Sequence, residues 1–207
     1  MAASYDRIAP VYDMLSRIVF GRTLERAQEA LLRCIPPRST ILIIGGGTGW
    51  ALERITTIYR EGLVIDYVES SAEMLQLSRG RDYGGNEVNF IHQSVEEFIT
   101  DTKYDIIITA FFFDNFRPDR ATMIFDKLAA MQSAASLWLY TDYIITPISP
   151  IWQRVLLKTM YTFFRITSGI EASSLPDMDS LFAKGHVPVF QKYFYRDFIR
   201  STAYRRI

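Results

Sequence analysis

The stretch ILIIGGGTGW, residues 41–50, places four branched aliphatic residues directly before four glycines in five positions. A short apolar run that starts after Pro37 and ends at glycines is typical of a strand buried on both faces, as in a parallel sheet. The glycines let the chain turn sharply and bring backbone amides close to a ligand, and Thr48 can begin a helix whose N-terminal amides attract electron-rich groups. The stretch therefore predicts a cofactor-binding turn.

The rest of the chain alternates strand-like apolar runs with amphipathic helical patterns, which predicts βαβ units on a parallel sheet. Two helical segments are expected between about Pro10 and Cys34. The runs HVPVFQKYFY and FIRSTAYRRI predict two C-terminal strands joined by a tight turn, an antiparallel pair at the sheet edge. The other expected strands are 40–44, 63–68, 87–91, 104–110 and 135–141.

Three expected helices open with recognisable start signals. Ser70 with Glu73 and Ser94 with Glu97 have the capping-box spacing, and Pro118 suits a first helical turn. Each opening follows an expected strand. Because ligands bind at the carboxyl ends of parallel strands, these loops should meet around the glycine turn.

Length and composition indicate one domain, residues 1–207, because 207 residues suffice for one substantial core. We divide it into an N-terminal helical cap (1–36), a binding core (37–142) and a C-terminal part (143–207). The formal net charge is zero and the basic residues are scattered, which argues against a nucleic-acid partner.

Cysteine and histidine are too few for a metal or disulfide framework, since Cys34 is the single cysteine and His92 and His186 form no ligand pattern. No basic region followed by an apolar one opens the chain, and no long apolar stretch follows. We therefore expect a cytoplasmic protein without a metal.

The glycine spacing narrows the choice of cofactor. A dinucleotide fingerprint G-x-G-x-x-G would need a glycine at Trp50, whereas the glycines stand at 45, 47 and 49. A phosphate-binding P-loop would need a Gly-Lys-Ser/Thr ending, and no lysine is near. A nicotinamide-dependent oxidoreductase is therefore a poorly fitting alternative.

The turn, with the carboxylate of Glu69 at the end of the next strand, resembles the S-adenosylmethionine (SAM) site of class I methyltransferases. YDRIAPVYDML is similar to the entry helix of ubiquinone and menaquinone C-methyltransferases and of bacterial phosphatidylethanolamine N-methyltransferases. VESSAEML, VNFIHQSVEEF and YDIIITAFFFDNF resemble the ribose, adenine and fourth-strand segments. The resemblance runs from about Tyr5 to Asp142, and its four segments occur in family order.

The resemblance implies an α/β, Rossmann-like fold with a seven-stranded, mostly parallel sheet, an antiparallel C-terminal edge strand and helices on both faces. It implies SAM as cofactor, S-adenosylhomocysteine as product and a small-molecule acceptor. The implied SAM-binding residues are Tyr12, Gly45, Gly46, Gly47, Thr48, Gly49, Glu69, Ser70, Met74, Ser94, Val95, Thr109, Ala110 and Phe111. Two positions depart from the family pattern: Ile43 replaces an acidic residue, and Ser94 replaces an aspartate.

Several of these residues also have a purely structural interpretation. Met74 can belong to the core, Ser94 can cap a helix, and Tyr12 can pack an N-terminal helix. Asp114 follows the fourth strand, where the methyl group should emerge, so it is a weak catalytic candidate, and the sequence favours a helix cap over that role. Methyl transfer depends on positioning and requires no protein nucleophile, which leaves the catalytic residue open.

Residues 148–168 combine a narrow polar stripe with a broad apolar surface. We expect either a lid over a hydrophobic or aromatic acceptor, such as a quinone precursor or a lipid, or a helix that covers the sheet. A membrane-surface role is a third interpretation. The competing function is a SAM-binding regulatory or membrane-associated protein without turnover.

Overall fold

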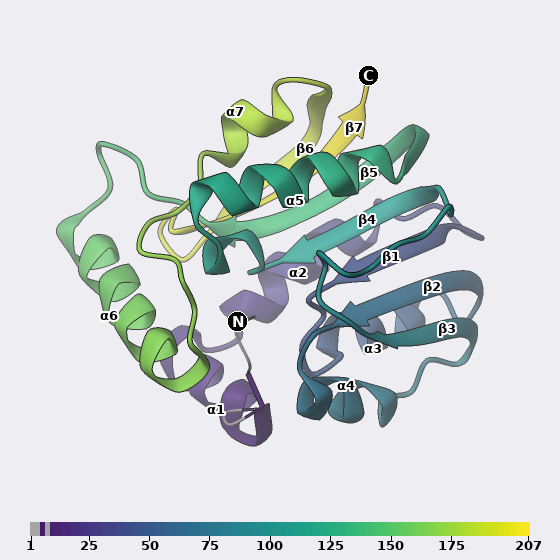
Figure 1. The fold of residues 1–207 in the computed structure, drawn as a ribbon, viewed down its shortest axis with the longest axis horizontal. Coiled ribbons are helices and arrows are strands. Elements are labelled where there is room, and N and C mark those ends of the chain that lie inside the picture. The colour runs from purple at the N-terminus through teal and green to yellow at the C-terminus, as the bar shows by residue number, and fades with distance from the viewer. Residues whose placement is uncertain (1–4, 7–8) are drawn as a thin grey trace.

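The computed structural model describes residues 5–6 and 9–207, and seven strands of this part form one sheet in the order β3-β2-β1-β4-β5-β7-β6 (Figure 1). The strands are β1 (Thr40–Ile44), β2 (Glu61–Glu69), β3 (Gly85–His92), β4 (Tyr104–Ala110), β5 (Gln132–Tyr143), β6 (His186–Phe194) and β7 (Ile199–Arg206). β1 to β5 pair in parallel, whereas β7 is antiparallel to both of its neighbours, β5 and β6. The predicted fold class is confirmed.

The antiparallel strand lies one place inside the edge, because β7 runs between β5 and β6. The burial patterns explain this order. Most of β7 is buried on both faces, whereas nearly all of β6 is exposed after His186. β6 is therefore the strand that suits an edge position.

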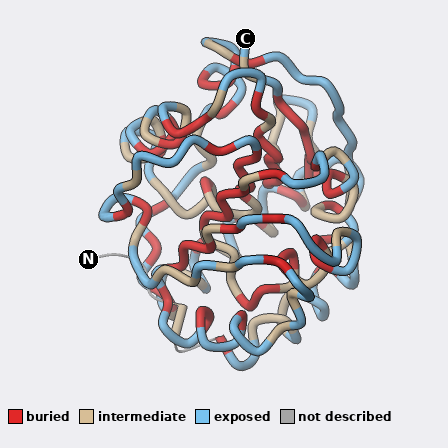
Figure 2. Tube along the Cα trace, turned by 90° about the vertical axis from the view of Figure 1, so that its right-hand side faces the viewer, coloured by how far each residue is buried: buried red, intermediate tan, exposed pale blue. Residues whose placement is uncertain are grey.

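Helices cover both faces of the sheet, and further helices lie beyond the carboxyl ends of its parallel strands (Figure 1). They are α1 (Ala9–Phe20), α2 (Thr23–Leu32), α3 (Trp50–Ile58), α4 (Ala72–Arg79), the 3-10 turn η1 (Phe113–Asn115), α5 (Pro118–Ala130), α6 (Ile151–Ser168) and α7 (Met178–Phe182). Figure 2 shows buried residues concentrated in the central strands and exposed residues on the outside.

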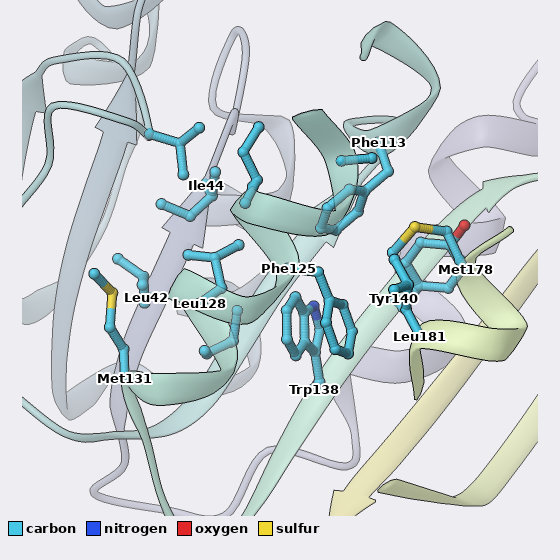
Figure 3. Packing of buried hydrophobic residues seen from close by; sticks show 14 of the residues in the cluster. Leu42, Ile44, Phe113, Phe125, Leu128, Met131, Trp138, Tyr140, Met178 and Leu181 are labelled. Carbon is cyan, nitrogen blue, oxygen red and sulfur yellow. The ribbon is translucent and has the colours of Figure 1, made fainter. Parts of the chain in front are cut away.

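Two cores sandwich the sheet, since alternate side chains of a strand point to opposite faces. Leu42 and Ile44 of β1 pack under α5 and α7, whereas Ile41 and Ile43 face α2 and α3. In the first core the rings of Phe125 and Trp138 stack at 5.0 Å (Figure 3). These cores hold the strand ends in place.

A third apolar cluster lies beyond the carboxyl ends of the strands and joins α6 to the N-terminal helices. Leu157 and Tyr161 of α6 share it with Phe20 of α1 and with Tyr143 and Phe198. α6 is thus placed at the sheet end rather than across a sheet face (Figure 1).

Two of the three predicted helix openings need correction. α4 begins at Ala72 with Ser71 as its N-cap, whose side chain accepts from the Met74 amide, so Ser70 is one position too early. Ser94 and Glu97 do exchange capping-box hydrogen bonds, Ser94 N to Oε2 at 3.2 Å and Glu97 N to Oγ at 3.3 Å. They close a turn instead of a helix. α5 begins at Pro118, as predicted.

Candidate functional site

The glycine turn joins β1 to α3 in a conformation that favours glycine. Gly45, Gly47 and Gly49 have φ values of 63°, 62° and 83°, which is the left-handed region that costs other residues steric strain. A Cβ on Gly45 would lie 2.6 Å from the ring of Phe112, whereas one on Gly47 would meet no atom within 4 Å. The ring of Phe112 therefore leaves no room for a side chain at Gly45, whereas the space beside Gly47 is open.

The carboxylate of Glu69 connects two loops at the strand ends. Its Oε2 accepts from the Gly47 amide at 3.0 Å and its Oε1 accepts from the Ser71 amide at 2.9 Å. Glu69 is only 7% exposed. Burial raises the pKa of this carboxyl, and the two backbone hydrogen bonds oppose that rise. The charged form is held in place by backbone dipoles in a mostly apolar setting.

A polar network ties the N-terminal helix to the turn. Thr48 Oγ1 donates to Asp13 Oδ1 at 2.9 Å. Arg81 donates through Nε to the Thr48 carbonyl at 3.0 Å and forms ion pairs with Asp13 at 3.3 Å and Glu53 at 2.9 Å. Asp13 and Arg81 were not predicted, because residues so far apart in sequence leave no local pattern.

A cavity of about 190 Å³ lies between α1 and the carboxyl ends of β1, β2 and β4. The structure places twelve of the predicted residues in its lining: Tyr12, Gly45, Gly46, Gly47, Thr48, Glu69, Ser70, Met74, Ser94, Val95, Ala110 and Phe111. Gly49 and Thr109 are not in that lining. Gly49 caps α3, and the Thr109 hydroxyl accepts from Trp138 Nε1 at 2.8 Å in the core.

Aromatic and charged side chains that were not predicted form the end of the cavity near Ser94. The rings of Phe112 and Phe116 meet edge to face at 4.9 Å. The guanidinium of Arg120 lies 5.1 Å from the centre of the Phe116 ring and donates to Glu96 at 2.6 Å. Phe112, Phe116, Glu96 and Arg120 all line the cavity.

Aromatic rings also close the opposite end, beneath α6. Tyr5 meets Tyr12 at 6.1 Å and Phe164 at 5.7 Å. Phe111 has a φ of 51°, an uncommon value for a bulky residue, and its amide donates to the Thr141 carbonyl at 2.8 Å. Such strain persists only where the surrounding structure imposes it, which is common at ligand sites.

Asp114 lies in η1, directly behind this aromatic end. It is not the N-cap of α5, which is Arg117, so the capping interpretation is wrong. Asn115 Nδ2 donates to Asp114 Oδ1 at 3.0 Å, and Asn115 lines the cavity. Burial raises the pKa of Asp114 to about 7.

The described residues hold neither a metal-binding cluster nor a membrane-spanning helix. Among residues 5–6 and 9–207 no three His, Cys, Asp or Glu side chains gather in a way that could hold a metal ion. In the same part of the chain no helix has the length and apolar character needed to cross a membrane.

No family model matches the chain, and no curated protein matches its sequence. Solved structures do match. Mitomycin 7-O-methyltransferase MmcR has a TM-score of 0.69 at 16% identity, over 99% of this chain and 61% of that chain. N-methyltransferase NodS from Bradyrhizobium japonicum WM9, in complex with S-adenosylhomocysteine, has a TM-score of 0.63 at 11% identity, over 88% and 87%.

Magnesium protoporphyrin IX methyltransferase from Synechocystis PCC 6803, with bound S-adenosylhomocysteine, has a TM-score of 0.62 at 16% identity, over 90% of this chain and 83% of that chain. This chain spans less than two thirds of the length of MmcR, the first structure described above. The likenesses show that it has the Rossmann-like fold of SAM-dependent methyltransferases.

Proposed function

We propose that this protein is a SAM-dependent methyltransferase that binds SAM in the cavity and transfers the methyl group to a small acceptor. The observation that carries the proposal is the buried carboxylate of Glu69, which lies against the glycine turn and lines the cavity. In an open α/β sheet the end of the second strand is where a carboxylate meets a ribose. Glu69 then accepts hydrogen bonds from both ribose hydroxyls.

The rest of SAM follows from the position of the ribose. Ser94, Val95, Phe112 and Phe116 would hold the adenine, because they bring aromatic faces and polar groups together in the lining. The Ser94 hydroxyl and amide both donate to Glu97, at 2.9 Å and 3.2 Å, so we assign the adenine contact to the backbone of the neighbouring Val95. The methionyl part lies along Gly45 to Thr48.

Ile43 stands where the family pattern has an acidic residue, and Asp13 supplies a carboxylate in its place. Both residues line the cavity, and the Asp13 carboxylate is placed beside the glycine turn by Thr48 and Arg81. We assign to Asp13 the attraction for the ammonium group of the methionyl part, because opposite charges in a partly buried site attract strongly. α1 therefore contributes both Tyr12, which covers the donor, and Asp13, which orients it.

Methyl transfer requires the acceptor atom, the methyl carbon and the sulfur in one line, so the protein acts by positioning and by excluding water. Tyr5, Tyr12, Phe111 and Phe164 provide an apolar aromatic boundary at the end of the cavity nearest α6. This boundary supports an acceptor with a hydrophobic or aromatic body. We propose that α6 is the lid over it.

The exposed surfaces of α1 and α6 support a peripheral contact with an anionic membrane. Both helices expose large apolar side chains, namely Val11, Met14, Ile18, Val19, Ile151, Val155, Phe163 and Ile166. α6 adds Arg154, Lys158 and Arg165, all exposed, and contains no acidic residue. Apolar and basic groups on one surface helix complement anionic lipid.

Binding and turnover test the proposal separately. Calorimetric titration should show saturable binding of SAM and S-adenosylhomocysteine and none of NADH. The reverse result would support an oxidoreductase and exclude the methyltransferase. Methyl-labelled SAM offered with a panel of small apolar acceptors then measures turnover. Binding of S-adenosylhomocysteine without any transfer across that panel would favour the regulatory alternative.

A further inference from the structure

Two carboxyl side chains lie at or just beyond the ends of the neighbouring strands β4 and β5 and are close enough to influence each other's charge. Asp114 lies in the turn that follows β4, and Asp142 lies at the end of β5. The two strand ends are bonded together, because the Phe111 amide donates to the Thr141 carbonyl at 2.8 Å. The charge of Asp114 acts on Asp142, whose pKa burial and that charge both raise.

Asp142 is a buried carboxyl with an unused oxygen. It is 2% exposed, its Oδ1 accepts from the Tyr143 amide at 2.8 Å, and its Oδ2 has no hydrogen-bond partner among the described residues. The nearby amides of Phe113 and Asp114 favour its ionised form without reaching hydrogen-bond geometry to Oδ2. An unpartnered buried carboxyl is costly, so its presence indicates a ligand.

The arginine opposite Asp142 in the sheet does not pair with it. Arg200 lies directly opposite Asp142 in the β5–β7 register. Its guanidinium instead donates to Asp179 of α7, with Nη1 to Oδ2 at 2.9 Å, and its Nε has no partner among the described residues. Arg200 is thus paired with Asp179, and Asp142 has no ion-pair partner among the described residues.

Four tyrosines lie within range of the Asp114 charge: Tyr143 and Tyr161 share the third apolar cluster with Tyr5, and Tyr5 contacts Tyr12. We call the set of Tyr5, Tyr12, Tyr143, Tyr161, Asp114 and Asp142 the tyrosine chamber. Burial raises the pKa of each tyrosine, and the charge of Asp114 raises it further. The Tyr161 hydroxyl, on the inner side of α6, has no hydrogen-bond partner among the described residues. Electron-rich ring faces and carboxyls together suit a cation.

The chamber adjoins the proposed methyl donor. Tyr5 and Tyr12 line the cavity, and the Tyr5 hydroxyl donates to Asn115 Oδ1 while Asn115 Nδ2 donates to Asp114. Asp114 itself is half-buried, and its hydrogen-bond partner Asn115 is the residue that lines the cavity. A group bound in the chamber is thus next to the end of the cavity where the methyl group would emerge.

We propose that the tyrosine chamber binds the acceptor as a protonated amine, with Asp114 as the base that receives its proton. This inference rests on the proposed methyltransferase function and names its substrate class. The ammonium gives one proton to the Asp114 carboxylate. The freed nitrogen lone pair forms the N–C bond while the C–S bonding pair stays on sulfur, which yields S-adenosylhomocysteine, a protonated N-methylamine and protonated Asp114. The apolar body of the amine lies against Phe164 and Phe111.

Matched amine and alcohol probes test the charge requirement. In protein saturated with S-adenosylhomocysteine, at pH 7.5, we expect 2-phenylethylamine and octylamine to bind about ten- to hundredfold more tightly than 2-phenylethanol and 1-octanol. Asp114→Asn should remove that preference, whereas Asp126→Asn, an exposed carboxylate on α5, should keep it. Labelled SAM should methylate the amines only, and Asp114→Asn should flatten the rise of kcat/KM with pH near 7.

Alcohols that bind as tightly as their amine counterparts, or an Asp114→Asn variant that keeps the preference, would overturn the inference. Asp142→Asn provides a second variant in case Asp114→Asn fails to fold, and it should weaken amine binding in the same direction. A parallel titration with S-adenosylhomocysteine distinguishes failure of the methyltransferase proposal from failure of the amine assignment. If that ligand binds while the amine preference is missing, the methyltransferase proposal stands and only the amine assignment falls.

Discussion

The carboxylate of Glu69, the last residue of β2, accepts a hydrogen bond of 3.0 Å from the backbone amide of Gly47 in the turn after β1. One side chain therefore shapes the glycine turn and lines the cavity that the turn encloses. A ligand that uses this carboxylate also depends on the turn that it holds. This coupling is the basis of the first prediction.

Glu69→Ala should weaken binding of SAM and S-adenosylhomocysteine by about 2 to 4 kcal/mol, because it removes two hydrogen bonds to a charged acceptor. Glu73→Ala, at an exposed residue in the first turn of α4, is the matched control and should bind normally. Calorimetric titration measures both. Unchanged affinity in Glu69→Ala, in a variant that melts as a folded protein, would show that the carboxylate serves only the turn.

Phe163 and Phe164 should behave differently, although the sequence treats them alike. Phe164 contacts Tyr5 at 5.7 Å and Tyr12 at 6.4 Å, whereas Phe163 is 39% exposed. Phe164→Ala should raise the acceptor KM or lower kcat by poorer positioning, with little change in SAM affinity. Phe163→Ala is the control. Loss of melting temperature in Phe164→Ala with normal acceptor kinetics in the folded fraction would exclude the lid.

Asp114 makes stability depend on pH in a direction opposite to that of most carboxylates. Its pKa of about 7 in the folded protein exceeds the ordinary value of 3.8, so the unfolded chain loses its proton first as pH rises. The contribution of Asp114 to stability is complete below about pH 3.8 and is lost by about pH 7. Asp114→Asn should therefore gain melting temperature relative to the parent on going from pH 4 to pH 8.

Other titratable groups near Asp114 can also make the melting temperature depend on pH. They are Tyr5, Tyr12, Tyr161 of α6, and Tyr143 and Asp142 of β5; Arg200 of β7 lies opposite Asp142 in the sheet. Burial raises the tyrosine pKa values and keeps those groups neutral in this range, and Arg200 stays charged, which leaves Asp142 as the second titrating group. Asp142→Asn should shift the melting temperature in the same sense. An equal difference from the parent at both pH values would contradict a raised pKa in either residue.

Anionic vesicles test the exposed face of α1 and α6. Val155→Asp should reduce sedimentation of the protein with phosphatidylserine vesicles, because it removes apolar contact and adds a repelled charge. Ile99→Asp changes an equally apolar residue that is 86% exposed away from these helices, and it should have no effect. Equal losses in both variants, or no sedimentation of the parent, would argue against a membrane contact.

The sequence predicts the strands best where apolar runs end sharply. The expected strand 104–110 is β4 as found, whereas the expected strand 135–141 extends to Gln132–Tyr143. Polar residues such as Gln132 and Asp142 do not look like strand residues, yet pairing with neighbouring strands extends β5 over them. The capping-box spacing also misplaced the start of α4, because Ser70 and Ser71 are equally good caps until the geometry at Glu69 selects Ser71.

Some residues of the candidate site can be predicted from the sequence, and others cannot. Cavity residues at strand ends, such as Gly47 and Glu69, follow from local pattern and topology. Asp13 and Arg81 come from separate elements and meet only through tertiary packing, which no local spacing announces. The acid pair of Asp114 and Asp142 is hidden for the same reason, since one residue resembles a helix cap and the other a strand end.

A crystal structure with S-adenosylhomocysteine tests the central claim most directly. We expect both ribose hydroxyls within hydrogen-bond distance of the Glu69 carboxylate, the adenine between the Ser94 loop and Phe112, and the sulfur facing Tyr12 and the tyrosine chamber. A ligand whose ribose lies away from Glu69, or whose sulfur points away from the chamber, would contradict the proposed donor site and the amine subsite that depends on it.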